Sequence, residues 1–350
     1  MTILFAVLLF SILIFVHELG HFLAAKAFKV RVNEFAMFMG PAIVKWGKGE
    51  TQYSIRCIPI GGYCAMEGED QDTNDPRSFQ KADWWKRLII LVAGSAMNLV
   101  AGFLILAIVF APAKQFITPV IDMAEPGCTV VREGGLQVGD EFVEIDGERI
   151  YVQSDFSMFL QLNPSQTHDL VVRRNGQKLV FDDYQMEKHL FPGEETERYG
   201  FSFGVEDATF GKKIQYTWNS GLNVIRSVRL SLQMMVSGQA GLKDMTGPVG
   251  IVQIMSDSAE SAENSTDAFL NMLYIGGFIA INLAVMNMLP IPALDGGRVF
   301  GLLLTCAIEG ITRKKLDPKY EGYVHGIGMI LLLAFMAIIL FKDIFVIFKR

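Results

Sequence analysis

Four long apolar stretches constrain this chain more than any other feature of its sequence. They occupy residues 3–27, 88–113, 269–289 and 324–348. Each is about long enough to cross a bilayer core of roughly 30 Å as a helix that rises about 1.5 Å per residue. A fifth stretch, 299–311, is too short to span and predicts an interfacial or partly buried helix. The pattern predicts a polytopic α-helical membrane protein with four transmembrane helices.

Composition supports a lipid environment and excludes other classes of protein. Hydrophobic residues make up 51% of the chain and charged residues 19%, whereas a typical soluble domain has about 25% charged residues. The net charge is −6 and no long basic run occurs, which argues against a nucleic-acid partner. Four cysteines at irregular spacing exclude a disulfide-stapled scaffold. The first stretch could instead be a cleaved signal peptide, but no basic residue precedes it.

The basic residues in the loops predict an orientation. Residues 26–87 carry ten lysines and arginines, residues 298–323 carry five, and the N-terminus carries none. Because such residues collect on the cytoplasmic side, we expect both loops in the cytoplasm. The N-terminus, the mixed 114–268 insert and the C-terminus would then lie outside the cell membrane.

An HExxH motif lies inside the first apolar stretch. His17 and His21 are four residues apart, so they share one helical face and both imidazoles reach one ion, while Glu18 projects toward a water molecule. A polar helix contact or an ion path is the alternative, but ionisable residues within a span are costly and by default functional. The motif predicts a zinc site, with Glu18 as the catalytic base rather than a ligand.

A catalytic zinc takes three protein ligands, and the strongest third candidate is Asp295. It follows the third stretch in the segment Asn287-Met-Leu-Pro-Ile-Pro-Ala-Leu-Asp-Gly-Gly297, where prolines end the helix and glycines allow the chain to bend. We therefore expect Asp295 on irregular backbone. His325, at the start of the fourth stretch, is an alternative ligand or a supporting residue, and an ordinary loop aspartate is the alternative for Asp295.

Counting along the spans predicts which groups share a depth. His17 lies about 21 Å below the outer membrane surface if each residue rises about 1.5 Å, and the third span runs inward to bring Asp295 to a similar level near the cytoplasmic side. The same count places Asn282 and Asn287 beside the expected metal. Amides within a span also join helices, so this second interpretation stays open.

Several motifs in order resemble the site-2 protease family. They are His17-Glu-Leu-Gly-His21, Phe38-Met-Gly-Pro41, Ile58-Pro-Ile-Gly-Gly-Tyr63, Asn98, Gly247-Pro-Val-Gly250, and Asn287 through Gly297. Together they cover essentially the whole chain and are most similar to the RseP-type bacterial branch of intramembrane zinc metalloproteases. This chain departs from some members of the branch because its insert has room for a single PDZ domain rather than two.

The resemblance implies a set of roles. His17, His21 and Asp295 would bind Zn²⁺, Glu18 would be the catalytic glutamate, and Asn282 and Asn287 would engage the substrate backbone. Cleavage of single-span membrane proteins after an earlier cut outside the membrane is implied, with anti-sigma factors and remnant signal peptides as substrate classes. The alternative is a non-catalytic receptor or metal carrier, which has no use for a base that is not a ligand.

Residues 1–113 contain the first two spans and a cytoplasmic region between them, and this region is predicted to contact the substrate. Residues 51–58 alternate as a strand between glycine turns, and we expect a membrane-associated β-hairpin over about 40–66. Its edge would accept a substrate strand near Tyr53 and Ile55, with Pro290 as a further contact. A purely structural loop is the alternative, and the resemblance favours the substrate-facing sheet.

The insert divides into two regions. Residues 119–207 contain strand-and-turn signals at Asp146-Gly147 and Asn175-Gly176 and resemble a PDZ domain, which would take a peptide or substrate ectodomain on a sheet edge. A passive spacer is the alternative. Apolar residues at helical spacing in 211–245 predict an amphipathic helix. It would lie on the membrane surface or against the spans, and packing on the PDZ-like region is the alternative. We therefore divide the rest into 211–268, amphipathic helix and linker, and 269–350, the last two spans.

Overall fold

The computed structural model describes residues 2–69, 73–191, 195–241, 246–313 and 319–349. The chain forms two compact units. The first unit comprises Met1–Leu106 and Val224–Arg350, and the second comprises Ala107–Asn223. The second unit is therefore an insert between the two halves of the first.

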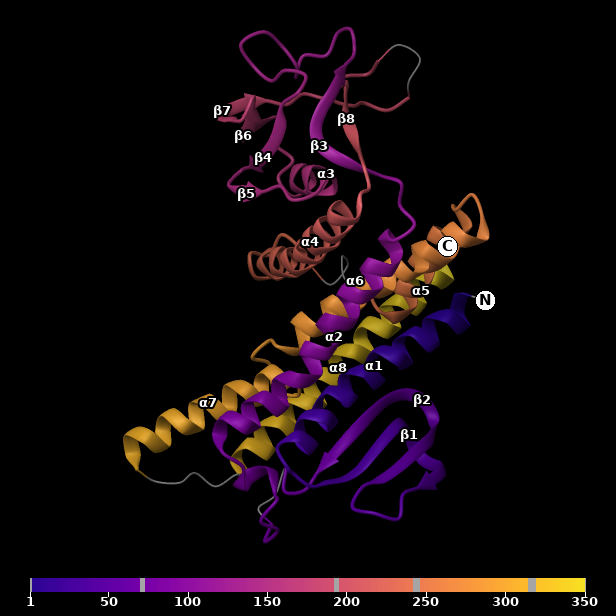
Figure 1. Ribbon diagram of the computed structural model, residues 1–350, viewed down its shortest axis with the longest axis vertical. Helices are drawn as coiled ribbons and strands as arrows, with labels where there is room; N and C mark the ends of the chain where they lie inside the picture. The colour runs from indigo at the N-terminus through magenta and orange to yellow at the C-terminus, as the bar shows by residue number, and fades with distance from the viewer. Residues whose placement is uncertain (1, 70–72, 192–194, 242–245, 314–318, 350) are drawn as a thin grey trace. The chain divides into compact units, whose positions relative to one another are not determined.

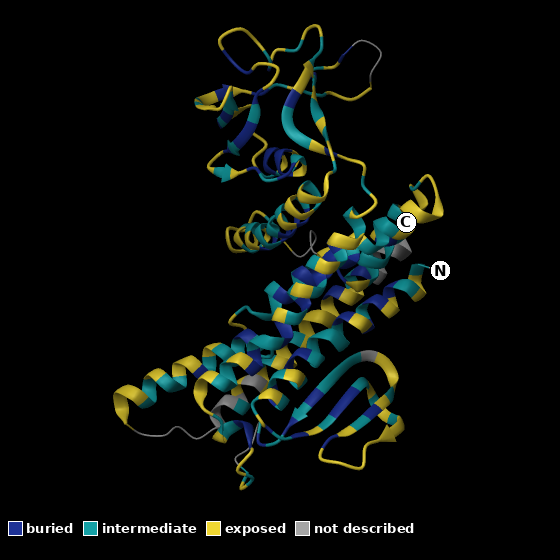
Figure 2. Ribbon diagram, in the orientation of Figure 1, coloured by how far each residue is buried: buried dark blue, intermediate teal, exposed yellow. Residues whose placement is uncertain are grey.

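Four helices in the described part of the chain are long and apolar enough to cross a membrane. They are α1 (Thr2–Ala27), α2 (Trp84–Phe110), α6 (Ser265–Asn287) and α8 (Lys319–Lys349). Their outward faces carry exposed leucine, isoleucine and valine, such as Leu8, Val100 and Leu104. Figure 2 shows exposed stretches in yellow along the helices. Apolar faces of this extent need lipid around them. The prediction of four helices long and apolar enough to span a membrane is confirmed for the described residues.

The inward faces of these helices pack into a bundle within the first unit. One buried cluster joins Leu9 and Leu13 of α1 to Ile279 and Ala280 of α6, and to Met255 of a helix that the sequence did not predict, α5 (Pro248–Glu260). The N-terminal end of α1 and the C-terminal end of α8 lie at one end of the bundle, and a β-sheet lies at the other (Figure 1).

The β-sheet beside the C-terminal half of α1 is built from two bent strands, β1 (Val32–Trp46) and β2 (Gln52–Met66). It begins earlier than the predicted 40–66 region, because residues 32–39 pair along the strand that ends at Met66. Since β1 and β2 fold back on each other, the sheet has four neighbouring segments. In order they are 58–66, 32–39, 52–56 and 42–46.

This order corrects the predicted substrate edge. Ile55 pairs with both Met37 and Val44, and Tyr53 pairs with both Phe35 and Trp46. Residues 52–56 therefore lie inside the sheet, where no substrate strand can be added. The sequence suggested an edge because a single hairpin has two outer strands, and the pattern gave no sign of the fold-back.

A half-buried carboxylate links segments of the sheet. The two carboxylate oxygens of Glu34 accept hydrogen bonds from Ser54 at 2.7 Å, Arg56 at 2.8 Å and Tyr63 at 2.8 Å. Burial alone would raise the pKa of Glu34, but these three donors outweigh it and lower the pKa to about 2. Glu34 is therefore charged at neutral pH and links three segments of the sheet.

The segment after α6 differs from the prediction of irregular backbone at Asp295. Asp295 is the first residue of α7 (Asp295–Thr312), and only residues 288–294 are irregular. Gly296 does not act as a bend: a Cβ there would lie 2.3 Å from the carbonyl oxygen of Met288, so glycine lets the first turn of α7 pack on the preceding loop. The short helix predicted over 299–311 is confirmed as part of α7.

The second unit is a six-stranded sheet with helices. Its strand order is β7-β6-β4-β3-β8, with β5 paired to β4. The elements are β3 (Gln115–Ala124), β4 (Glu141–Ile145), β5 (Glu148–Arg149), α3 (Gln153–Leu162), β6 (Thr167–Arg174), β7 (Gln177–Gln185) and β8 (Phe201–Asp207). Both predicted turns join neighbouring strands, and Asp146 and Asn175 have positive φ, as primed hairpin turns require.

The 211–268 region is more than one helix and a linker. α4 (Phe210–Val236) covers most of the predicted amphipathic stretch, and α5 follows it. The aromatic ring of Tyr216 stacks on Phe116 at a centroid distance of 4.1 Å, which anchors the first turns of α4 to β3 within the second unit. Residues 242–245, at the end of the predicted helical stretch, lie outside the described residues.

Candidate metal centre

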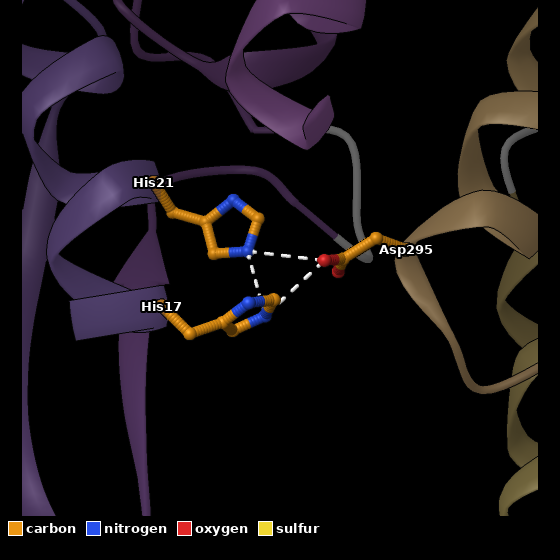
Figure 3. A group of neighbouring side chains, drawn as sticks. All are labelled: His17, His21 and Asp295. Atoms are coloured by element: carbon orange, nitrogen blue, oxygen red, sulfur yellow. Dashed lines mark hydrogen bonds and ion pairs between the residues drawn. The ribbon is translucent and has the colours of Figure 1, made fainter. Parts of the chain in front are cut away.

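Three metal-binding side chains meet where α1 approaches the start of α7. His17 and His21 lie one helical turn apart on α1, so both rings project from the same face. Asp295 approaches from the first position of α7, and Figure 3 shows both rings turned toward its carboxylate. The structure therefore brings together the three residues that the sequence predicts as ligands.

The spacing of the three ligand atoms fits one tetrahedral ion. His17 Nε2 and His21 Nε2 are 3.3 Å apart, and Asp295 Oδ2 lies 3.2 Å from the first and 3.4 Å from the second. Ligands bound to zinc at about 2.0–2.2 Å in a tetrahedron are separated by about 3.3–3.6 Å. A single ion fits between these three atoms with ordinary bond lengths.

Two polar atoms of the cluster, His17 Nδ1 and Asp295 Oδ2, are buried and have no hydrogen-bond partner among the described residues. The side chains of His17, His21 and Asp295 are 12%, 9% and 18% exposed. Asp295 Oδ2 has no hydrogen bond of good geometry with any described residue, although a buried carboxylate oxygen needs a donor or a cation. The donor set and its burial thus fit a bound zinc ion.

The second span helps to orient His21. Its Nδ1 lies 2.8 Å from the main-chain carbonyl oxygen of Ile90 on α2. A carbonyl only accepts, so the ring proton resides on Nδ1 and Nε2 is left free for a metal. This is the usual outer contact of a metal-binding histidine.

Close packing of α1 and α2 leaves no spare volume beside the imidazoles. A Cβ at Gly94 of α2 would lie 2.3 Å from His21 Nε2 and 2.8 Å from His17 Cε1. A Cβ at Gly20 of α1 would lie 2.4 Å from the carbonyl oxygen of Ala93. Sequence reasoning missed Gly94 and Ile90, because which residues of α2 face the motif depends on how the helices pack.

Glu18 lies next to the cluster but outside it. Its side chain faces the sheet, where its Cγ is 3.5 Å from the position of a Cβ at Gly62 of β2. Gly62 belongs to the 58–66 segment, which is an outer segment of the sheet. Glu18, the neighbour of His17 on α1, therefore lies beside an outer segment of the sheet.

The remaining predicted residues are not part of the three-ligand cluster. Asn282 lies within α6 and Asn287 is its last residue, and both are half-buried. Pro290 is exposed in the loop that follows. The side chain of His325 lies outside the described residues, so its predicted role as ligand or supporting residue stays open.

Comparison with known proteins agrees with this geometry. The model of peptidase family M50 matches residues 5–335. A Clostridium acetobutylicum protein named among the zinc metalloproteases is 34% identical over 346 residues, covering 98% of this chain and 97% of its own length. The zinc metalloprotease RasP of Shouchella clausii is 27% identical over 424 residues, covering 98% of each chain.

A similar Clostridium perfringens protein, also named among the zinc metalloproteases, is 35% identical over 346 residues and covers 98% of each chain. The family match and these identities extend over both halves of the first unit and the insert between them. The chain therefore belongs to peptidase family M50, the site-2 protease family, and is a metalloprotease.

Proposed function

We propose that this chain is an intramembrane zinc endopeptidase that cleaves single-span membrane proteins. The observation that carries the proposal is the cluster of His17 and His21 on the membrane-spanning helix α1 with Asp295 at the start of α7, whose ligand atoms lie close enough together to hold one metal ion. Zn²⁺ is the cofactor named for the metalloprotease relatives. In this position it supplies Lewis acidity, which polarises a peptide carbonyl and makes a water molecule acidic near neutral pH.

The residues around the metal have different roles in peptide hydrolysis. His17, His21 and Asp295 hold the ion, and the bond from His21 Nδ1 to Ile90 fixes one ring. Glu18 accepts a proton from the attacking water and delivers it to the leaving nitrogen. Asn282 and Asn287 are proposed to hold the substrate backbone through their side-chain amides.

The substrate must lose its helical hydrogen bonds before it can be cut. Carbonyl groups in an intact helix are already bonded, and extended backbone in lipid is tolerated only where protein satisfies its polar groups. The 58–66 segment passes Glu18 and pairs on one side with residues 32–39, while no described residue pairs with its other side. We propose that the unwound substrate binds along this edge of the 58–66 segment. This replaces the predicted binding edge at residues 52–56.

Cleavage of purified reporters tests the function. The full chain in lipid is expected to cut a single-span reporter whose helix contains destabilising residues. Incubation with 1,10-phenanthroline should remove zinc and abolish cleavage, and stoichiometric zinc should restore it, because the metal ion supplies the Lewis acidity that hydrolysis needs. The non-chelating 1,7-isomer is the matched control. Cleavage that persists without zinc, or intact reporters after incubation with the zinc-loaded protein, would count against an endopeptidase.

The same reporters test the role proposed for the second unit. We propose that this unit is a PDZ-like domain that binds an extended peptide or ectodomain and admits substrates already trimmed outside the membrane, such as anti-sigma factors or remnant signal peptides. Its support is the antiparallel sheet with a helix between β5 and β6. A reporter with a large ectodomain should be cut more slowly than its trimmed form, and equal rates would leave only a spacer.

Natural cysteines test the proposed orientation in a bacterial cell membrane. From the basic residues of the loops we propose that the sheet lies in the cytoplasm and the second unit outside. Cys57 is exposed on the sheet and Cys128 is partly exposed in the second unit. A membrane-impermeant maleimide should label Cys57 only from the cytoplasmic side and Cys128 only from outside, with the Cys57→Ser and Cys128→Ser variants identifying each band. Labelling of Cys57 from outside would reverse the topology.

A further inference from the structure

A buried amide on the second span has no role in the site described above. Asn98 of α2 is 1% exposed, and its Oδ1 has no hydrogen-bond partner among the described residues. Leaving a buried acceptor unsatisfied costs about 1–3 kcal/mol. Such a group in a spanning helix is expected to have a partner when the protein works.

The register of α1 against α2 shows which residue Asn98 faces. Moving outward along α1, His21 meets Ile90 and Gly94, and His17 meets Gly94, so the two helices run in opposite directions at this contact. Asn98 is one turn beyond Gly94 on the same face of α2. Helical side chains lean back toward the preceding turn, so the direction expected for the amide is toward Gly94, on the side of His17.

His17 has the complementary unsatisfied atom. Its Nδ1 is buried and has no hydrogen-bond partner among the described residues, whereas Nε2 points to Asp295. When Nε2 binds a metal, the proton of a neutral imidazole is on Nδ1, which then needs an acceptor. His21 already has one in the carbonyl oxygen of Ile90, and His17 lacks the equivalent contact.

We propose that Asn98 is the positioning residue for His17, with its Oδ1 accepting the Nδ1 proton of His17 directly or through one water molecule in the zinc-loaded enzyme. The inference rests on the proposed role of His17 as a ligand. Each imidazole would then be oriented by α2, one by a main-chain acceptor and the other by a side chain. Ser95, whose buried Oγ also lacks a partner among the described residues, is available to hold a bridging water.

Zinc affinity of three variants separates positioning from packing. Asn98→Leu keeps the shape of the side chain and removes the acceptor, so zinc should bind about 10- to 100-fold more weakly, as for other losses of an outer contact. Asn98→Asp keeps an acceptor and should stay close to the parent. Ser11→Ala on α1, which removes a buried hydroxyl bonded within its own helix, is the control and should leave affinity unchanged.

Cobalt substitution observes the hydrogen bond itself. In the Co²⁺-loaded parent, paramagnetically shifted NMR signals should show two slowly exchanging imidazole N–H protons, one for each histidine. Asn98→Leu, loaded with Co²⁺ at a saturating concentration, should lose or speed the exchange of one of the two and keep the other. The parent spectrum tests the proposal without depending on whether any variant folds. A single slowly exchanging imidazole proton in the parent would overturn the proposal.

The outcomes distinguish this inference from the proposed function. If His17→Ala binds zinc as tightly as the parent, His17 is not a ligand and both proposals fail. If His17→Ala loses zinc while Asn98→Leu binds it normally, only the positioning role fails. Equal losses of affinity in Asn98→Leu and Asn98→Asp would also overturn it, because they would show a packing role.

Discussion

Replacing Glu18 with glutamine is expected to abolish peptide cleavage and leave zinc bound. The glutamine side chain has nearly the same size but cannot accept a proton from water at neutral pH. Because Glu18 lies beside the ligand cluster and is not part of it, the metal site should stay intact. General base catalysis typically contributes about 10²- to 10⁴-fold, so kcat for a helix-destabilised reporter should fall by at least the lower figure.

Two further variants test whether the loss of activity in Glu18→Gln comes from the missing carboxylate. His17→Ala should lose both zinc and activity, since it removes a ligand. Glu18→Asp keeps a carboxylate one methylene shorter and should retain partial activity with full zinc content. Metal content by atomic emission and cleavage rate are measured on the same preparations. A Glu18→Gln protein that cleaves at the parent rate would remove Glu18 from the reaction.

Adding a single methyl group at Gly94 is expected to damage the metal site severely. The new Cβ of Gly94→Ala would lie 2.3 Å from His21 Nε2 and 2.8 Å from His17 Cε1, which is too close for either ring to stay in place. Overpacking of this kind costs about 1–3 kcal/mol. Because the strain is relieved only when the ligands move, zinc should bind about 10- to 100-fold more weakly, as measured by competition with a chelator.

Gly102→Ala on the same helix is the matched control. Its Cβ would lie 2.5 Å from the Cγ1 atom of Ile281 on α6, a contact that touches no ligand. We expect a lower thermal stability with unchanged zinc affinity. If Gly94→Ala and Gly102→Ala affect zinc binding equally, the effect of Gly94→Ala is general destabilisation and the steric argument is wrong.

The sequence was sufficient to predict the spans and the ligand set for physical reasons. Each span is a local property of about 20 consecutive apolar residues. The spacing of His17 and His21 puts them on one helical face whatever surrounds the helix. Asp295 could be predicted because the direction and length of the spans fix its depth, even though it begins a helix rather than lying on irregular backbone.

Features that depend on packing between distant segments could not be predicted. The interior position of Ile55 follows from β1 and β2 folding back on each other, and alternation of apolar residues reads the same in an inner and an outer strand. Gly94 and Ile90 became visible only when the register of α1 against α2 was known. The helix α5 was missed within a region that was expected to be mainly linker.

The folded-back sheet also limits what the enzyme could select in its substrates. Its outer segment offers a row of main-chain groups beside Glu18, and strand addition of this kind takes its affinity from the backbone of the incoming peptide. Recognition there would depend little on the identity of side chains and strongly on how easily a helix comes apart. Proteins of unrelated sequence would then be substrates of this protease if their membrane helices contain a locally unstable segment. A stable membrane helix would resist unwinding and would not be cleaved.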